Sequence, residues 1–239
     1  MLNGLGDFLV QETESLLDIF YLIAVRGLSI TLAITLLSLV IGFVVGTALA
    51  LMRVYGTIEL RWISIGYEKI FRAIPLLVLL FIFGAALLGW FMWAGSIGAA
   101  LFVAGVFALA LRSAAYQSEI FRGAIMSVDV GQMMAARSMG MTETQATRYI
   151  ILPQAFRLSL PGWTNEYAVV IKDSSLVSAI GVTEMLYQAQ AFTNTYPALF
   201  LGIILVISII YFIFTYPVTK YVGENMTVKL RELGLGGGK

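Results

Sequence analysis

The sequence predicts an all-α integral membrane protein with five transmembrane helices, from its composition, its long uncharged stretches and the placement of its basic residues. Of its 239 residues, 59% are hydrophobic and 12% are charged. Soluble domains carry about 25% charged residues, because their surfaces must be hydrated. A chain with half that share requires lipid as the solvent for much of its outer face.

Four apolar stretches are long enough to form transmembrane helices, and one of them must be divided. Residues 27–52 and 198–219 carry no charge, and each reaches the roughly 20 residues that cross a bilayer. Residues 73–111 are also uncharged but too long for one span, and the glycines at 89–98 predict a turn inside them. Residues 158–180 are apolar apart from three ionisable residues. We expect a single transmembrane domain over residues 1–239, with spans at about residues 24–52, 70–92, 98–124, 158–180 and 197–219.

The basic residues favour an N-terminus outside the cell and a C-terminus in the cytoplasm, because lysine and arginine collect on the cytoplasmic side of a bilayer. They occur after the first span, between the third and fourth spans, and in the C-terminal tail. The N-terminal segment is acidic, and the turn between the second and third spans is uncharged. This arrangement requires an odd number of spans. The cytoplasmic segment at residues 126–156 contains helix formers bounded by Gly131 and Gly140, which predict a short helix there.

The composition also limits the available functions. The chain has no cysteine and no histidine. It therefore lacks disulfides and thiol catalysis, and it lacks the commonest general base and metal ligand. We expect neither a catalytic site nor a metal site. The formal net charge of +1 gives no indication of nucleic acid binding. The sequence has no phosphate loop of the G-x-x-x-x-G-K-[ST] type, so any ATPase must be another polypeptide.

The cytoplasmic segment contains a motif that resembles a known family. Residues 131–140 read Gly-Gln-Met-Met-Ala-Ala-Arg-Ser-Met-Gly, and residues 150–153 read Ile-Ile-Leu-Pro. They are similar to the loop of ATP-binding-cassette (ABC) importer permeases, in which Glu-Ala-Ala is followed by a glycine and later by Ile-x-Leu-Pro. Met134 stands in place of the family's glutamate. The resemblance implies that the ATPase-coupling residues are Gly131, Gln132, Met133, Met134, Ala135, Ala136, Arg137 and Gly140.

The residue types in this motif suit a contact with a partner. Alanines let a short helix seat closely in a groove, while methionines supply an adaptable apolar surface. An ordinary amphipathic helix in the membrane interface is the alternative interpretation.

Three further segments make the resemblance more specific. Residues 71–78 (Phe-Arg-Ala-Ile-Pro-Leu-Leu-Val), residues 114–123 (Ala-Ala-Tyr-Gln-Ser-Glu-Ile-Phe-Arg-Gly) and Asn165 with residues 172–176 (Lys-Asp-Ser-Ser-Leu) are similar to segments of the polar amino acid permeases. The likeness covers residues 26–219. It implies a permease subunit that moves polar amino acids across a prokaryotic cytoplasmic membrane by alternating access, as a homodimer or as a heterodimer with a second permease. The implied partners are cytoplasmic ABC ATPase subunits, which bind ATP and Mg, and an extracellular or periplasmic amino-acid-binding protein. The chain itself is expected to bind no cofactor.

Polar side chains at membrane depth are candidates for the substrate pathway, because ionisable groups in lipid are costly unless they face a cavity or a partner. A basic side chain could hold the α-carboxylate of an amino acid, and an acidic one its α-ammonium. The alternative is that these charges pair with each other and join helices. Arg112, Tyr116 and Glu119 share one helical face, and Asn165 and Lys172 share another. The candidates are Arg112, Tyr116, Glu119, Asn165, Lys172, Asp173, Ser174 and Ser175.

An ion-gradient-driven secondary transporter or channel is the alternative function. Secondary transporters often contain inverted repeats and discontinuous helices in matching positions, and neither is recognisable in this sequence. Two other patterns are interpreted as architectural. Gly42-x-x-x-Gly46 allows a close approach of two helices, and Pro75 breaks or starts the second span near its cytoplasmic end.

Overall fold

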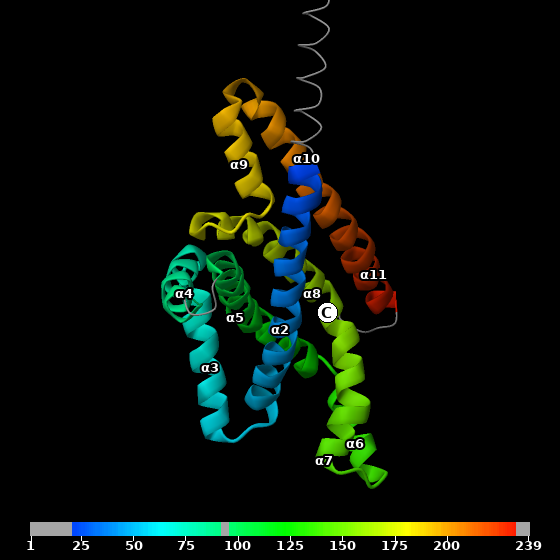
Figure 1. Cartoon of the computed structure of the whole chain (residues 1–239). Coiled ribbons are helices and arrows are strands. Elements are labelled where there is room, and N and C mark those ends of the chain that lie inside the picture. Colours follow the sequence, from blue (N-terminus) through cyan, green and yellow to red (C-terminus); the bar gives the residue numbers. More distant parts are fainter. Residues whose placement is uncertain (1–20, 92–95, 233–239) are drawn as a thin grey trace, which may run out of the picture.

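The computed structural model describes residues 21–91 and 96–232, and within these ranges the chain forms helices and no strand (Figure 1). The predicted all-α class is confirmed. The first part of the chain contains η1 (Leu22–Gly27), α2 (Leu28–Tyr55), α3 (Ile58–Ala73), α4 (Leu76–Phe91) and α5 (Ile97–Met126). The second part contains α6 (Val130–Ser138), α7 (Glu143–Ala146), η3 (Thr147–Ile151), α8 (Leu152–Asp173), η4 (Ser174–Ile180), α9 (Met185–Thr195), η5 (Pro197–Leu199), α10 (Phe200–Pro217), η6 (Val218–Glu224) and α11 (Asn225–Glu232).

Helices α2 and α5 form the centre of the fold, and they approach closely because of the two glycines of α2. A Cβ atom on Gly42 would lie 2.6 Å from Gln117 Nε2, and one on Gly46 would lie 2.9 Å from the Ala114 carbonyl oxygen. Only glycine fits at such distances, as in the small-residue contacts of membrane helices. The packing role predicted for Gly42 and Gly46 is confirmed.

The second predicted span is broken at Pro75. Helices α3 and α4 meet at an angle of 101°. Proline cannot donate the next helical hydrogen bond and pushes the preceding residue out of the helical region, and Ile74 has the extended backbone angles φ −79° and ψ 127°. The break predicted at Pro75 is therefore present. The segment between the first and second predicted spans is largely the helix α3, and α4 begins at Leu76, whereas the second span is predicted from about residue 70.

Helix α8 begins earlier than predicted and ends earlier. It runs from Leu152 to Asp173, whereas the predicted span covers residues 158–180. From Ser174 the chain continues as the tighter turn η4, and it leaves that turn at Gly181, whose φ of +90° is in the left-handed region. The hydroxyls of Ser174 and Ser175 each donate at 2.7 Å to the backbone carbonyl three residues earlier. Such bonds compete with the regular helical pattern.

Three helical stretches of the described residues are long and apolar enough to cross a membrane, namely Val25–Tyr55, Ile97–Met126 and Pro197–Leu230. They correspond to the first, third and fifth predicted spans. The bent pair of α3 and α4 is a further candidate. Helix α8 is not among these candidates, so the count of five spans remains a prediction. The acidic N-terminal segment, the middle of the predicted turn and the tail fall at residues 1–20, 92–95 and 233–239, outside the described residues.

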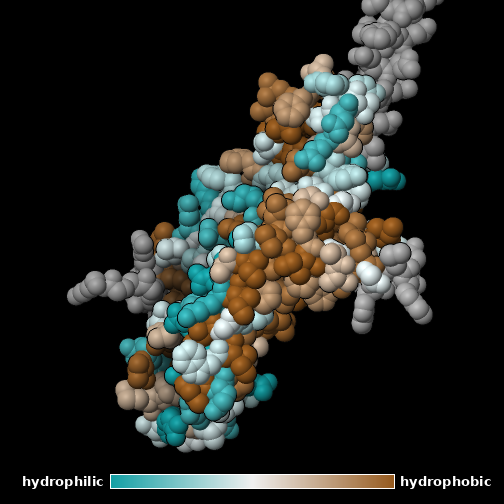
Figure 2. Space-filling view, turned by 90° about the vertical axis from the view of Figure 1, so that its left-hand side faces the viewer, coloured by the Kyte–Doolittle hydropathy of each residue, from teal (hydrophilic) through white to brown (hydrophobic). Residues whose placement is uncertain are grey.

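Exposed hydrophobic side chains identify the surface that suits lipid. On α2 they follow helical spacing at Leu36, Val40 and Val44, and on α10 they include Ile209 and Ile213. Figure 2 shows hydrophobic atoms over much of one face of the molecule. Apolar patches of this extent are rare on soluble monomers. This surface agrees with the membrane location that the composition predicts.

A buried carboxylate joins the hairpin of α9 and α10 to α2. Glu184 is fully buried, and its side chain caps α9 by accepting a hydrogen bond from the Tyr187 N–H at 2.7 Å. The hydroxyls of Thr31 on α2 and Tyr211 on α10 each lie 3.4 Å from Glu184 Oε2 and donate to it. The Thr31 oxygen also accepts from the Met185 N–H at 3.2 Å. One side chain therefore links three helices.

Replacing Glu184 by alanine should lower the thermal unfolding midpoint of the purified protein in detergent. The change removes a helix cap and leaves the partly buried Tyr211 hydroxyl without its acceptor, whereas Thr31 keeps the Gly27 carbonyl at 3.1 Å, so the combined cost is about 1–3 kcal/mol. Glu184→Gln keeps one acceptor oxygen and should lose less than Glu184→Ala. Glu59 lies exposed on α3, and Glu59→Ala is the matched control that should leave the midpoint unchanged. An unchanged midpoint in Glu184→Ala would contradict the linking role.

Candidate functional site

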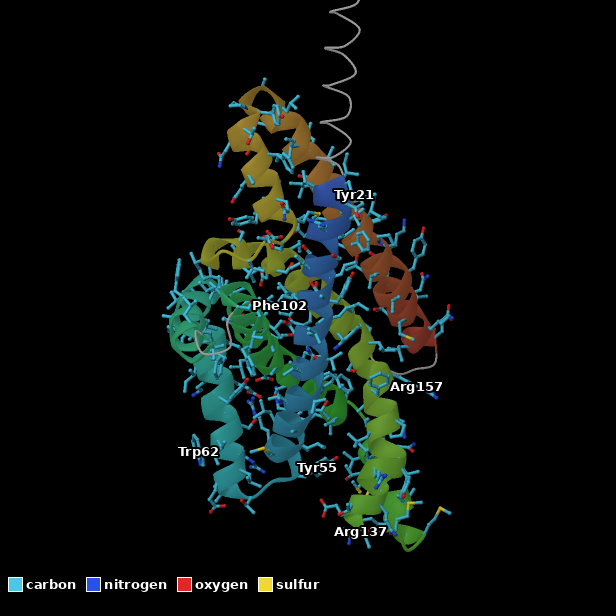
Figure 3. All side chains as sticks on the ribbon, in the orientation of Figure 1. Tyr21, Tyr55, Trp62, Phe102, Arg137 and Arg157 are labelled. Carbon is cyan, nitrogen blue, oxygen red and sulfur yellow. The ribbon has the colours of Figure 1, made fainter. Side chains whose placement is uncertain are left out.

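A short helix lies where the sequence predicts one between the third and fourth spans. Helix α6 begins after Asp129, whose side chain accepts from the Gly131 N–H at 2.7 Å. It ends near Gly140, whose φ of +87° is in the left-handed region that glycine adopts readily. Figure 1 places α6 and α7 at one end of the molecule, opposite the hairpin of α9 and α10. Arg137 lies at this tip (Figure 3).

Helix α6 has one buried side and one exposed side. Ala136 is 5% exposed, and Met133 packs against the cluster that contains Ile151 and Ala155. Ala135 is exposed, while Met134 and Met139 are 61% and 82% exposed. Met133 is partly buried and so contributes less to the exposed surface than the other two methionines. What remains outside is a small alanine flanked by two flexible apolar side chains.

Gln132 and Arg137, two further predicted coupling residues, are exposed, and each makes one polar contact. Gln132 Oε1 accepts from the Gln154 side-chain amide at 3.4 Å, which joins α6 to α8. Arg137 lies 3.9 Å from Glu143 on α7. Helix α7 begins with a reciprocal cap, in which Thr142 and Gln145 satisfy each other's backbone N–H groups. The segment is therefore an ordered two-helix projection attached to α8.

Two of the predicted pathway residues form an ion pair between α5 and α8. Arg112 donates to Asp173 Oδ2, and the two side chains are 21% and 26% exposed. Charge-assisted contacts between a guanidinium and a carboxylate are among the stronger hydrogen bonds in proteins. The pair joins the middle of α5 to the last residue of α8, so it can respond to relative movement of the two helices.

Tyr116 lies next to Arg112 on the same face of α5. The Arg112 guanidinium is 5.1 Å from the centre of the Tyr116 ring, and the Arg72 guanidinium is 5.0 Å from it. Both distances are within the range of cation–π attraction. Tyr116 therefore connects Arg112 with Arg72, which the sequence places near the break between α3 and α4.

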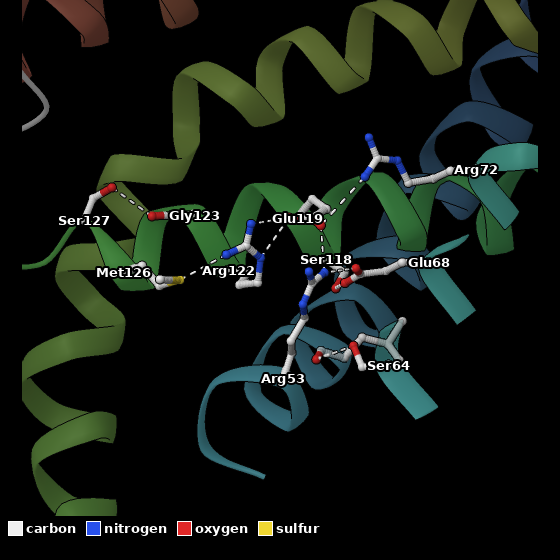
Figure 4. Close-up of polar contacts among 11 residues, drawn as sticks. Arg53, Ser64, Glu68, Arg72, Ser118, Glu119, Arg122, Gly123, Met126 and Ser127 are labelled. Atoms are coloured by element: carbon white, nitrogen blue, oxygen red, sulfur yellow. Dashed lines mark hydrogen bonds and ion pairs between the residues drawn. The ribbon is translucent and has the colours of Figure 1, made fainter. Parts of the chain in front are cut away.

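Glu119, one turn beyond Tyr116, belongs to a cluster of ion pairs (Figure 4). Its Oε1 lies 2.7 Å from Arg53 and 3.8 Å from Arg72, and its Oε2 lies 2.6 Å from Arg122. Arg53 also pairs with Glu68, which accepts a further bond from the Ser118 hydroxyl. The cluster fixes α3 against α2 and α5.

The other predicted pathway residues lie on or just after α8. Asn165 and Lys172 are both exposed in the isolated chain and lie on one face of the helix. Ser174 is fully buried. The hydroxyls of Ser174 and Ser175 are occupied by the backbone carbonyls of Ile171 and Lys172. The structure thus brings Arg112, Tyr116 and Asp173 together, but it holds the two serine hydroxyls in local bonds.

A buried series of side-chain hydrogen bonds next to the Arg112–Asp173 ion pair was not among the predicted sites. The Ser113 hydroxyl donates to Glu166 at 2.7 Å, and it accepts from the Gln117 side-chain amide at 3.0 Å. The Gln117 side-chain oxygen accepts from the Trp163 indole N–H at 2.9 Å. Ser113 and Gln117 are four residues apart on α5, as are Arg112 and Tyr116. That spacing was a signal that polar residues cover two adjacent faces of this helix.

Comparison with known proteins identifies the family. Residues 38–219 match the family described as binding-protein-dependent transport system inner membrane component. This chain belongs to that family. The matched residues include α6, α8 and every predicted coupling and pathway residue.

The permease is similar to several curated proteins along most of its length. It is 33% identical over 204 residues to the probable glutamine ABC transporter permease protein GlnM of Bacillus subtilis (strain 168), with 84% of this chain and 90% of that protein covered. It is 38% identical over 200 residues to the nopaline transport system permease protein NocM of Agrobacterium fabrum, with 80% and 81% covered. The arginine transport system permease protein ArtQ of Bacillus subtilis (strain 168) is 34% identical over 212 residues, with 86% and 91% covered.

Solved structures agree with this assignment. The permease matches a chain of the crystal structure of an amino acid ABC transporter with histidines, with a TM-score of 0.74 and 34% identity over 89% of this chain and 96% of that chain. An inward-facing conformation of the MetNI methionine ABC transporter matches with a TM-score of 0.69, over 87% of this chain and 98% of that chain. At 22% identity, the second match shows the fold alone.

Family membership confirms the importer-permease prediction and decides against a secondary transporter or channel. The cluster around Glu119 shows what the sequence interpretation missed. Arg53 and Arg72 were used only as charges that set the orientation of the chain. The available signal for an amphipathic helix was the four-residue spacing of Ser64 and Glu68. Both side chains are buried on α3.

Proposed function

We propose that this permease is the membrane-spanning subunit of an ABC importer for polar amino acids, folded as a single transmembrane domain with five spans and an external N-terminus. The observation that carries the proposal is its similarity, over four fifths of the chain or more, to permeases named for glutamine, arginine and nopaline transport. A second permease, either a copy or a sister chain, completes the pathway. An external binding protein delivers the amino acid.

Arg112 and Asp173 are the proposed substrate contacts. An amino acid carries the same two charges as this pair, so it can insert between them. Arg112 then receives the α-carboxylate, and Asp173 the α-ammonium. Partial exposure of both side chains supports this role, because a substrate can reach them and because a pair in contact with water contributes only about 0–1 kcal/mol to stability. The exposed Asn165 and Lys172 suit the wall of a pathway shared with the second permease.

Helix α6 is the proposed contact with the cytoplasmic ATPase. Its exposed Ala135, between Met134 and Met139, suits insertion into a groove of another protein. In this scheme ATP and Mg bind only to the ATPase subunits. ATP binding brings these subunits together, α6 moves with them, and the helices turn the substrate site outward.

Purified permease should hydrolyse no ATP, because the proposed ATPase is a separate subunit. ATPase subunits added to permease in proteoliposomes should hydrolyse ATP, faster when the loaded binding protein is present. The measurement is phosphate release, with an ATPase variant that lacks its phosphate-loop lysine as the control for contaminating activity. Robust hydrolysis by the permease alone, or no stimulation of the complex by the binding protein, would contradict the proposed function.

A further inference from the structure

An open cavity of about 580 Å³ is lined by residues of α2, α3 and α5, from Tyr116 to Glu119 along α5. Its volume is within the range of roughly 300–1,000 Å³ that small-molecule sites occupy. The polar residues that line it are Arg53, Glu68, Lys69, Arg72, Tyr116 and Glu119. Except for Lys69, Figure 4 or the contacts above place all of them in the ion cluster or against it. The cavity is separate from the Arg112 pair.

The charged side chains around this cavity differ in how closely they are paired with an opposite charge. Arg53 and Arg122 hold the two carboxylate oxygens of Glu119, at 2.7 Å and 2.6 Å. Arg72 is left 3.8 Å from Glu119, with its side chain 43% exposed. Lys69 is exposed and forms no ion pair with any residue that the structure describes. The cavity therefore offers two weakly engaged cations to an anionic group.

A reachable acceptor lies beside these cations. Glu68 is only 4% exposed at its side chain, whereas Glu119 is 25% exposed. Both carboxylates line the cavity, and Glu119 is the more accessible of the two to a small molecule in it. Arg72 and Glu119 present a cation and a carboxylate a few ångströms apart, the same complement to a zwitterion that Arg112 and Asp173 present further along α5.

Tyr116 lies between the Arg112–Asp173 pair and the Arg72–Glu119 pair. Its ring has the Arg112 guanidinium at 5.1 Å and the Arg72 guanidinium at 5.0 Å. Both arginines are thus held by one aromatic side chain, and each is also next to a carboxylate. A zwitterion that leaves Arg112 towards the cytoplasm meets Arg72 as the next cation along this face.

We propose that the cavity is a second binding site for the amino acid, on its exit route. Arg72 and Lys69 receive the α-carboxylate, and Glu119 receives the α-ammonium. The proposal rests on the proposed function, because it takes the transported amino acid as the ligand. Such a site lowers the free-energy cost of leaving Arg112, because the carboxylate and the ammonium of the substrate gain new partners at once.

The test uses the absence of cysteine from the chain. Ala73 is an exposed residue of the cavity lining, so Ala73→Cys places the only thiol of the permease there. The complete complex reacts with a membrane-impermeant methanethiosulfonate, and intact mass measures labelling of this chain. The protecting probe is a mixture of the common L-amino acids with nopaline, without cysteine, because the free thiol of cysteine would consume the reagent. A mixture of amino acid amides, which lack the carboxylate, is the chemical control.

Amino acids should slow labelling of Ala73→Cys about tenfold when they are present at about ten times their dissociation constant, because about one site in eleven then stays empty. The amides should not protect. Ser127→Cys, on the exposed cytoplasmic end of α5, should be labelled at the same rate with and without amino acids. Adding Arg72→Gln to Ala73→Cys should remove the protection, whereas adding Arg112→Gln or the exposed control Arg157→Gln should retain it.

Three results would overturn the second site. They are an absence of protection in the Ala73→Cys complex, protection that survives Arg72→Gln, and protection that disappears with Arg112→Gln, which would trace the effect to the first site. Failure of the proposed function looks different. The complex would then lack ATP hydrolysis stimulated by the loaded binding protein, and that property is measured before labelling begins.

Discussion

Arg112→Gln should reduce amino acid uptake by about 10- to 100-fold while ATP hydrolysis stimulated by the binding protein persists. The reason is the loss of a charge-assisted bond to the α-carboxylate, worth about 1.5–3 kcal/mol, where about 1.4 kcal/mol corresponds to tenfold in binding. Uptake of radiolabelled amino acids into proteoliposomes that contain the complete complex measures the effect. Hydrolysis is expected to persist because α6 contacts α8 at Gln154, near the start of the helix, whereas Asp173 is its last residue.

A double variant separates substrate binding from a structural pair. Arg112→Gln leaves Asp173 without its partner, which can by itself destabilise the protein. Arg112→Gln combined with Asp173→Asn removes both charges and leaves no unpaired one. If the pair only joins α5 to α8, the double variant should recover uptake. Under the proposed function it should recover thermal stability while uptake stays low, and recovered uptake would refute the substrate role.

Ala135→Glu should uncouple the ATPase subunits from transport without unfolding the permease. The residue is exposed at the tip of the molecule, so a glutamate there meets no neighbour in the isolated chain. In a groove of the ATPase it would be a buried charge without a partner. Disrupting a hot-spot residue near the centre of an interface costs about 2 kcal/mol or more, which is roughly 30-fold in association. Co-purification of the ATPase and uptake should both fall by that factor or more.

Lys229→Asp is the matched control for Ala135→Glu. Lys229 is also exposed and lies on the C-terminal helix α11, where an added acidic group should leave uptake within twofold of the unmodified protein by the usual size of surface effects, about 0.5 kcal/mol. The thermal unfolding midpoint should be unchanged in both variants. Normal uptake by Ala135→Glu would exclude this surface of α6 as the coupling contact.

The helical spacing of residues on α5 predicted part of the candidate site correctly. Arg112, Tyr116 and Glu119 were expected on one face because they follow spacings of four and three, and the structure places Tyr116 against Arg112. Helix geometry is local, so the sequence contains it. The partners of these residues come from other helices, and spacing along one helix cannot specify them.

The segment after the first predicted span shows what charge patterns alone leave out. Its four basic residues were used only to set the orientation of the chain, because lysine and arginine gather on the cytoplasmic side of a bilayer. Three of them lie on α3, and Arg72 and Glu68 of this helix reach towards α5. An amphipathic helix can carry the same charges as a loop. Only the polar residues that it buries, such as Ser64, distinguish the two.

The limits of α8 were missed for a different reason. The hydropathy pattern continues through residues 174–180, but the serines there bond to the backbone and tighten the chain. At the other end, polar residues before 158 extend the helix towards η3 and α6. Hydropathy measures the preference of a segment for lipid, and it does not record where a helix begins or ends.

Helix α8 has a mechanical consequence. Its 22 residues cover roughly 33 Å of helix axis at about 1.5 Å per residue. The Gln154 contact to α6 is near one end and Asp173 is at the other, with Pro161 inside the helix between them. Because an interior proline removes a helical hydrogen bond and bends a helix, Pro161 divides α8 into two arms, one attached to the projection and the other to the ion pair. A movement of α6 therefore reaches the distance between Asp173 and Arg112 through the bend at Pro161.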